Sequence, residues 1–240
     1  METQNLTIKF RCPPELDGVL PRPIPAVRGL PDWFKAMPQT AFSTLLQSDQ
    51  MTVKKCPPVI DAMTAGYLMP LICDLDVRDG EFSWDRDVPT GALTGFLRAP
   101  IDFHDNNQLV GTPFFHADRI AIKFNNFWTF ELPPGYSLLV THPFNRMDLP
   151  FTTLTGLVDA DRYSGNFVNF PAHWRDEGFS GVLPKGTPVA QCIPVKRDNW
   201  KASFGVIEDE GVTQQLELSM TMLQEPGIYR RRFRAPKRYY

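Results

Sequence analysis

The sequence lacks the short motifs that mark several common classes of enzyme and metal protein. Its four cysteines form no C-x-x-C pair, and it contains neither a G-x-x-x-x-G-K-[ST] phosphate loop nor a G-x-S-x-G nucleophile turn. These absences exclude a zinc knuckle, a P-loop nucleotide hydrolase and an α/β-hydrolase of the usual pattern. Internal repeats and low-complexity segments are also missing.

A large net charge and long apolar runs are also lacking. The net charge is −2, which gives no general attraction to nucleic acid or membrane. The most apolar stretch, "AGYLMPLIC", is far shorter than the ~20 residues of a membrane span and contains a proline. The start "METQNLTIKFRCPP" is too polar for a secretory signal. We therefore expect a cytoplasmic protein with no membrane partner, whose cysteines are reduced thiols.

Proline, in contrast, is abundant, with 23 among 240 residues. Proline is excluded from helix interiors and from central strands, so this density favours many short strands joined by ordered loops. Residues 51–103 and 118–141 alternate apolar and polar side chains, and "DVRDGEFSW" contains the D-G turn of a hairpin. The sequence predicts an all-β protein, with a helical turn near Asp32.

A single longer helix is expected close to the end of the chain. In "DEGVTQQLELSMTMLQEPG", Val212, Leu216, Met220 and Leu223 recur at helical spacing, and Pro-Gly follows them. The segment "KRDNWKASF" is a candidate for a second, short helix.

We expect one domain that spans residues 1–240. Residues 1–55 form an N-terminal strand and a proline-rich wrap, and residues 56–196 form the β core, with an insertion near 72–130. Residues 197–240 form the helix and a basic, aromatic tail.

One block of the core resembles the dUTPase and dCTP deaminase superfamily. The words "PPGY", "GLVDADRYSG" and "LPKGTPVAQ" are similar, in this order, to that family's P-x-G-Y turn, its G-[VIL]-[IV]-D-x-x-Y-x-G hairpin and its K-x-G-x-x-[IV]-A-Q segment. Upstream, "TAGYLMPL" resembles a degraded form of its first motif, A-G-x-D-L. The resemblance implies a dUTPase-like distorted β-barrel, of β-clip or jelly-roll-like type, in a homo-oligomer that is commonly a trimer with sites between subunits.

The resemblance also implies a set of functional residues. The catalytic base would be Asp159, or Asp161 if the hairpin is shifted in register, and Tyr163 would stack on a sugar. Gln191 would lie near the hairpin that reads the base. The implied function is binding or hydrolysis of a nucleotide-like molecule, with Mg²⁺ left open as a cofactor.

The chain departs from the family where phosphate would bind. The family's P-R-S-G is replaced by "PFNR", so that Phe144, Asn145 and Arg146 stand where Arg, Ser and Gly are usual. The first-motif aspartate is replaced by Leu68. His142, Asn145 and Arg146 remain the best polar candidates for ligand contact there. We therefore expect a divergent member, for which nucleotide hydrolysis remains an open hypothesis.

Two other functions compete with the nucleotide hypothesis. The first is a non-enzymatic, oligomeric or structural protein, for example of a virus particle, that reuses the fold; a pocket closed by apolar side chains such as Phe144 would favour it. The second is an Fe(II)/2-oxoglutarate-type oxygenase, because His116 and Asp118 have H-x-D spacing and His173 follows on the same β core. Only this last hypothesis requires Fe²⁺ and a metal site.

The tail "YRRRFRAPKRYY", residues 229–240, concentrates positive charge and aromatic rings. Such a mixture can bind nucleic acid or clamp phosphates. The simpler interpretation is a tail that lies on an acidic neighbouring subunit.

Overall fold

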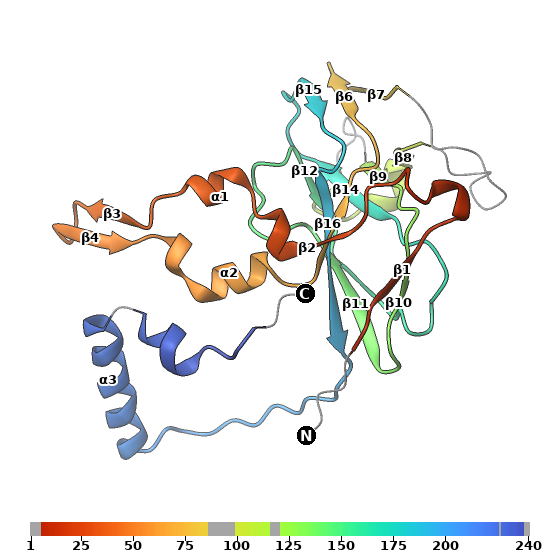
Figure 1. Cartoon of the computed structure of the whole chain (residues 1–240). Coiled ribbons are helices and arrows are strands. Elements are labelled where there is room, and N and C mark those ends of the chain that lie inside the picture. Colours follow the sequence, from red (N-terminus) through yellow and green to blue (C-terminus); the bar gives the residue numbers. More distant parts are fainter. Residues whose placement is uncertain (1–5, 86–98, 116–120, 226, 238–240) are drawn as a thin grey trace. The chain divides into compact units, whose positions relative to one another are not determined.

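The computed structural model describes residues 6–85, 99–115, 121–225 and 227–237, and it shows mostly antiparallel β-structure with few helices (Figure 1). Its contacts divide the chain into two compact units. Unit 1 comprises Met1–Pro31 and Met63–Arg197, and unit 2 comprises Asp32–Ala62 and Asp198–Tyr240. The single domain that the sequence predicts for residues 1–240 stays a prediction.

The largest sheet of unit 1 brings together segments that are far apart in the sequence. Its central strand is β16 (Pro188–Lys196), which pairs on one side with β11 (Tyr136–Thr141) and on the other with β5 (Tyr67–Pro70). The sheet is completed by β13 (Gly156–Val158) next to β11 and by β2 (Ile24–Pro25) next to β5.

The remaining strands of unit 1 form smaller antiparallel sheets. Four strands follow the order β12-β14-β9-β8, three follow β15-β6-β7, and β1 pairs with β10. Their bounds are β12 (Phe151–Thr153), β14 (Phe170–Trp174), β9 (Ala121–Phe124), β8 (Ile101–His104), β15 (Gly181–Leu183), β6 (Leu75–Arg78), β7 (Glu81–Ser83), β1 (Lys9–Arg11) and β10 (Thr129–Glu131). Three short 3₁₀ turns lie between them, η1 (Pro14–Leu16), η2 (Ala26–Gly29) and η4 (Asn106–Leu109).

Unit 1 has a core of buried aliphatic and aromatic side chains. Phe151 of β12 is central to this core. The centroid of its ring lies 4.7 Å from the ring centroid of Phe124 and 6.2 Å from that of Trp174. Leu138 and Cys192, from the five-stranded sheet, belong to the same buried cluster. Among the described residues no sheet closes into a barrel. The structure is mostly β-sheet with few helices, in line with the predicted class, and the dUTPase-like barrel stays a prediction.

Several local expectations agree with the structure. The D-G turn joins β6 and β7, where Asp79 (φ 52°) and Gly80 (φ 80°) both adopt the left-handed conformation that a two-residue hairpin requires. The N-terminal strand is β1, and the helical turn near Asp32 is α1 (Asp32–Ala36).

Other expectations are wrong. Residues 51–103 are not all strand, because α2 (Pro57–Met63) begins with two prolines, which the first turn of a helix tolerates since its N–H groups have no intrahelical acceptor. The alternation of residues 118–141, interrupted by "PPGY", also suggests a hairpin, but β10 and β11 do not pair with each other, because β10 pairs with β1. Residues 198–207 contain no helix.

Unit 2 consists of short elements and extended chain. Beside α1 and most of α2 it contains the hairpin β3 (Thr40–Ser43) and β4 (Ser48–Met51), the 3₁₀ turn η3 (Val53–Lys55), the helix α3 (Asp209–Gln224) and the π-helical turn η5 (Tyr229–Phe233). Arg234, after η5, donates hydrogen bonds to the carboxylate of Asp61 on α2, at 3.2 Å from Nε to Oδ2 and 2.5 Å from Nη2 to Oδ1. The tail is thereby fixed to α2.

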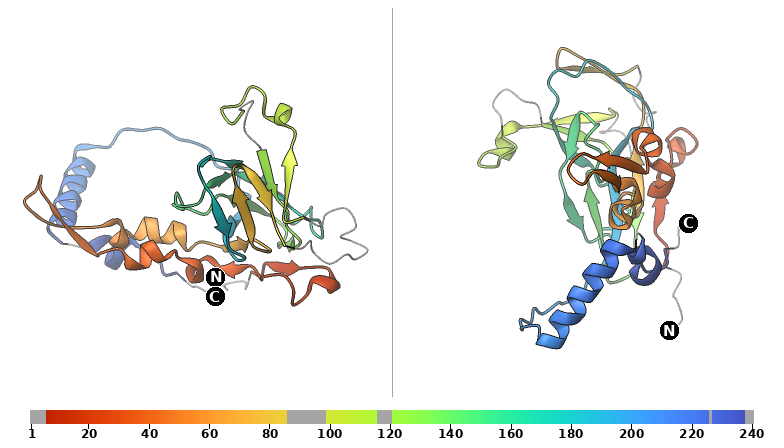
Figure 2. Two further views of the ribbon diagram at one scale, coloured as in Figure 1. Left: turned by 90° about the horizontal axis from the view of Figure 1, so that it is seen from above. Right: turned by 90° about the vertical axis from the view of Figure 1, so that its left-hand side faces the viewer.

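The predicted C-terminal helix is confirmed as α3. Acidic residues Asp209 and Glu210 occupy its first turn, where the helix dipole favours negative charge. Figures 1 and 2 show η5 beside the end at which α3 finishes. Across the described ranges, no helix has the length and apolar character that a membrane crossing requires.

Candidate functional site

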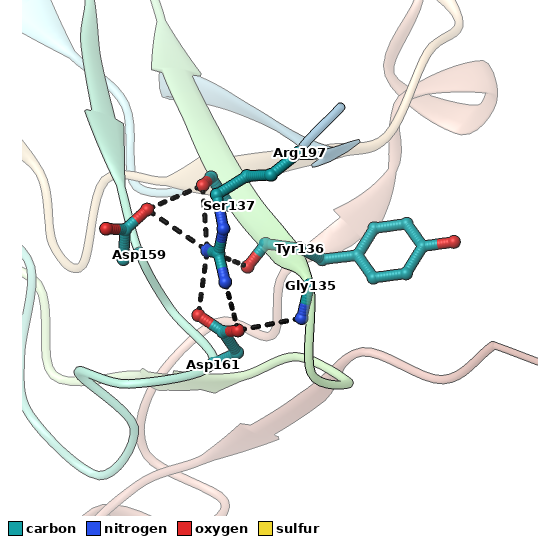
Figure 3. Close-up of polar contacts among 6 residues, drawn as sticks. All are labelled: Gly135, Tyr136, Ser137, Asp159, Asp161 and Arg197. Carbon is teal, nitrogen blue, oxygen red and sulfur yellow. Dashed lines mark hydrogen bonds and ion pairs between the residues drawn. The ribbon is translucent and has the colours of Figure 1, made fainter. Parts of the chain in front are cut away.

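The two aspartates predicted as alternative bases lie together, and an arginine joins them (Figure 3). Arg197 Nη1 is 3.1 Å from Asp159 Oδ1 and 2.9 Å from Asp161 Oδ1, and its Nη2 also donates to Asp161 Oδ2. The same Nη1 lies 3.1 Å from the carbonyl oxygen of Tyr136. The guanidinium therefore neutralises both carboxylates and ties them to the start of β11.

Asp161 is the more enclosed of the two carboxylates. Its side chain is 6% exposed, and Oδ2 also accepts a hydrogen bond of 2.8 Å from the backbone N–H of Gly135. The hydrogen bond from Arg197 is the main cause that lowers the pKa of Asp161 to about 2, and the Gly135 bond contributes in the same direction. Because a base with so low a pKa holds a proton only weakly, Asp161 is unsuited to activating water at neutral pH.

Asp159 keeps more contact with solvent. Its side chain is 54% exposed, and Oδ1 accepts from Ser137 Oγ at 2.7 Å as well as from Arg197. If one of the two aspartates acts on a ligand, its exposure assigns that role to Asp159. Tyr163 is exposed too, and its backbone N–H donates to the carbonyl of Asp159 at 2.8 Å.

Local sequence explains why this cluster forms. Gly135 of "PPGY" has φ 88°, a conformation that glycine adopts without the strain of a Cβ atom, and this turn aims its N–H at Asp161. Its carbonyl oxygen accepts from the backbone N–H of Arg197 at 2.8 Å, which directs the end of β16 toward the same turn.

A second group of predicted residues surrounds Gln191 in the five-stranded sheet. Gln191 is 1% exposed; its Oε1 accepts from the backbone N–H of Phe144 at 2.9 Å, and its Nε2 donates to the carbonyl of Ala65 at 2.7 Å. One side chain thus connects the segments "TAGYL", "PFNR" and "VAQ", which the sequence analysis selected separately. The amide makes these bonds within the protein, so its geometry is that of a structural link.

The polar residues of "HPFNR" are also engaged within the chain. His142 Nε2 lies 2.9 Å from the carbonyl oxygen of Arg146, and Arg146 makes a two-pronged ion pair with Asp148. Burial is the main cause that lowers the pKa of His142, so the ring is neutral at physiological pH. Asn145 is exposed and adopts φ 61°, as a turn residue does.

The two groups do not share one pocket within a chain. Asp159 and Asp161 lie at the start of β11 and His142 follows its end, so the rise along the strand separates them by about 20 Å. The cavity next to Gln191, Phe144 and Arg146 has a volume of only about 10 Å³, enough for one water molecule.

A larger surface cavity, of about 530 Å³, lies elsewhere in unit 1. Phe10, Arg11, Arg22 and Trp128 contribute to its lining, together with Cys12. None of the predicted site residues contributes to this cavity. Its arginines are already paired, Arg11 with Glu131 at 3.2 Å and Arg22 with Asp17 at 3.6 Å, so the cavity offers little free charge for a ligand.

The oxygenase function stays a prediction. His116 and Asp118 lie outside the described residues, while His173 lies on β14, where it is paired in register with Ala121 of β9. Among the residues that are described, no three His, Cys, Asp or Glu side chains come close enough to hold a metal ion.

Arg197, the residue that organises the aspartate cluster, was not predicted from the sequence. Arg197 follows the last position of β16 and belongs to no motif of the resemblance. Its partners lie about 36 and 38 residues away, and only the pairing of β16 with β11 brings them together. No local signal in the sequence marks this contact.

Comparison with known proteins adds no family assignment. A scan against protein-family models gives no match. A search of curated proteins likewise finds none that is similar enough to match.

Proposed function

We propose that this chain is a non-catalytic building block that assembles with further copies of itself, on a divergent dUTPase-like fold. The observation that carries the proposal is the composition of unit 2. In its described part, Phe34 and Ile228 are the only buried apolar side chains. A unit with so small a core gains little stability from its own folding.

The same unit exposes many large apolar side chains. Trp200 and Phe204, on the extended segment after Arg197, are 91% and 95% exposed, and Leu45 at the tip of the β3–β4 hairpin is 89% exposed. More than half of the exposed large apolar side chains of the described chain belong to unit 2, although it holds about a third of the residues. Apolar surface gathered in this way is typical of a protein–protein interface.

A second copy is the partner that the charges favour. Helix α3 and the residue before it carry acidic side chains and no basic one, whereas the turn η5 contains Arg230, Arg231 and Arg232. Surfaces of opposite charge on one unit can pair with the same surfaces of another copy, as a two-fold symmetric interface requires.

Support for the divergent fold comes from the five-stranded sheet. The segments similar to the family's motifs fall on β5, β11, β13 and β16, which are neighbours in that sheet. Support for a non-catalytic role comes from the polar residues at these motifs. Asp161 is held by Arg197 and Gly135, and Gln191 is held by Ala65 and Phe144.

The test is the mass of the full chain in solution, measured by sedimentation velocity over a dilution series. Self-assembly predicts a species of two or more chains at micromolar concentration that dissociates on dilution. A chain that stays monomeric throughout the series would overturn the proposal.

Nucleotide binding is the second candidate, and the exposure of Asp159 and Tyr163 on the same turn favours it. A thermal-shift series with deoxynucleotides and ribonucleotides, each with and without Mg²⁺, tests it. A ligand at a hundredfold its dissociation constant adds about 2.7 kcal/mol to the free energy of unfolding. A shift with deoxynucleotides that disappears in Tyr163→Ala would support nucleotide binding. The absence of any shift would leave self-assembly as the remaining candidate function.

A further inference from the structure

Helix α3 carries an apolar stripe that the described part of its own unit does not cover. Val212, Leu216, Met220 and Leu223 fall within an arc of about 80° on a helical wheel, and all four are exposed, Leu216 by 62% and Leu223 by 80%. A stripe at this spacing is the face by which a surface helix packs against another element.

The stripe is not the side by which α3 meets the rest of unit 2. The half-buried residues of the helix, Gly211, Leu218 and Thr221, lie roughly on its opposite side. Gly211 faces Ile207, whose Cγ2 would be 2.7 Å from a Cβ built on this glycine. One side of α3 therefore meets its own chain, and the described residues leave the stripe on the other side exposed.

Charge is distributed unequally along the helix. Glu208, Asp209 and Glu210 stand at its start, and in the described part of the chain none of the three makes an ion pair. The turn η5 lies at the far end, where Arg230 and Arg232 are exposed and have no ion-pair partner among the described residues (Figure 2). One end of the stripe is thus acidic and the other is basic.

We propose that α3 packs antiparallel against α3 of a second copy, stripe against stripe. In this arrangement the acidic start of each helix lies opposite the basic turn of the other, and the two helix dipoles also oppose each other favourably. A parallel pair would instead bring acidic start against acidic start. Antiparallel packing also matches the stripe to itself, since Val212 then faces Leu223 and Leu216 faces Met220.

This inference rests on the proposed function, and its test separates the two. The full chain is compared by sedimentation velocity with Leu216→Lys on the stripe and Gln215→Lys at an exposed polar position outside the stripe. Both variants add the same charge to the same helix. The inference predicts that Leu216→Lys weakens association by more than about tenfold, while Gln215→Lys leaves it close to that of the unchanged chain.

Charge reversal then tests the orientation. Antiparallel packing predicts that Asp209→Lys with Glu210→Lys weakens association, and that Arg230→Glu with Arg232→Glu does so too. All four changes in one chain restore it, because each acidic–basic contact is rebuilt with opposite sign. In a parallel pair each double variant would only replace one contact of like charges by another, so neither would weaken association strongly, and that result would overturn the proposed orientation.

The outcomes are distinguishable. An oligomer that is unaffected by Leu216→Lys refutes the α3 interface and leaves self-assembly standing through another part of unit 2. A chain that is monomeric before any substitution refutes both. Far-UV circular dichroism and thermal midpoints of each variant establish that a change in mass is not caused by unfolding.

Discussion

Replacing Gln191 by leucine should destabilise the protein strongly, although the two side chains are similar in size. The substitution removes the bond to the N–H of Phe144 and the bond to the carbonyl of Ala65. Both backbone groups then lose their partner inside the sheet. An unsatisfied buried group costs about 1–3 kcal/mol, and these two are partly buried, so we expect a loss of about 2–4 kcal/mol in the free energy of unfolding.

Thermal denaturation followed by circular dichroism measures this loss. For a chain of this length, about 2–4 kcal/mol lowers the midpoint by roughly 5–15 °C. Gln39→Leu, at an exposed position, is the matched control and should stay within about 0.5 kcal/mol of the unchanged protein. A stable Gln191→Leu variant would refute the structural role of this amide, and loss of nucleotide binding at unchanged stability would assign it to a ligand.

Gln191→Glu refines the same test. The glutamate still accepts from Phe144, but when ionised it cannot donate to the carbonyl of Ala65. Protonation restores a donor, so the variant should be less destabilised at pH 5 than at pH 7, relative to the unchanged protein.

The remaining predictions concern two glycines and the aspartate cluster. Gly66→Ala should be severely destabilising, because φ is 67° and the added Cβ would lie 2.2 Å from a backbone oxygen. Gly135→Ala, at φ 88° in open space, should cost only about 1–2 kcal/mol of the free energy of unfolding. Urea unfolding compares the two variants, and equal losses would contradict the packing around Gly66. The pKa of Asp161 is lower in the folded than in the unfolded chain, so its contribution is complete above about pH 4 and is lost as the pH falls toward 2. Asp161→Asn should therefore flatten the decline of the thermal midpoint over this range, and an unchanged decline would refute the assignment. Arg197→Met should lower the midpoint at pH 7 more than at pH 3, since protonation relieves the carboxylate that the substitution leaves without its cation.

The sequence predicts the parts of this protein that depend on neighbours in the chain. The D-G turn of Asp79 and Gly80 and the spacing of Val212 to Leu223 are local signals, and both elements lie where these signals place them. The high proline content wrongly suggested strands and loops around Pro57. This residue begins α2, because the first turn of a helix tolerates proline although the helix interior excludes it.

The candidate site was less predictable, since its contacts are long-range. Asp159, Asp161 and Gln191 were recognised as unusual from their motifs, and they do make specific polar contacts. Their partners, among them Arg197, are far away in the sequence and meet them only through strand pairing. Residue type alone therefore did not distinguish a carboxylate that is available to a ligand from one that already forms an ion pair with an arginine.

The sequence does not predict what covers the apolar side chains of unit 2. The apolar side chains of its helix were recognised, but an apolar stripe predicts burial without saying what covers it. The exposure of Leu216 and Trp200 shows that the described chain does not cover them. This finding directs the account toward assembly.

Sedimentation velocity of the full chain at micromolar concentration, followed through dilution, tests the central claim most directly. The account predicts an oligomer that dissociates on dilution and is weakened by Leu216→Lys. A chain that sediments as a monomer at every concentration would contradict it.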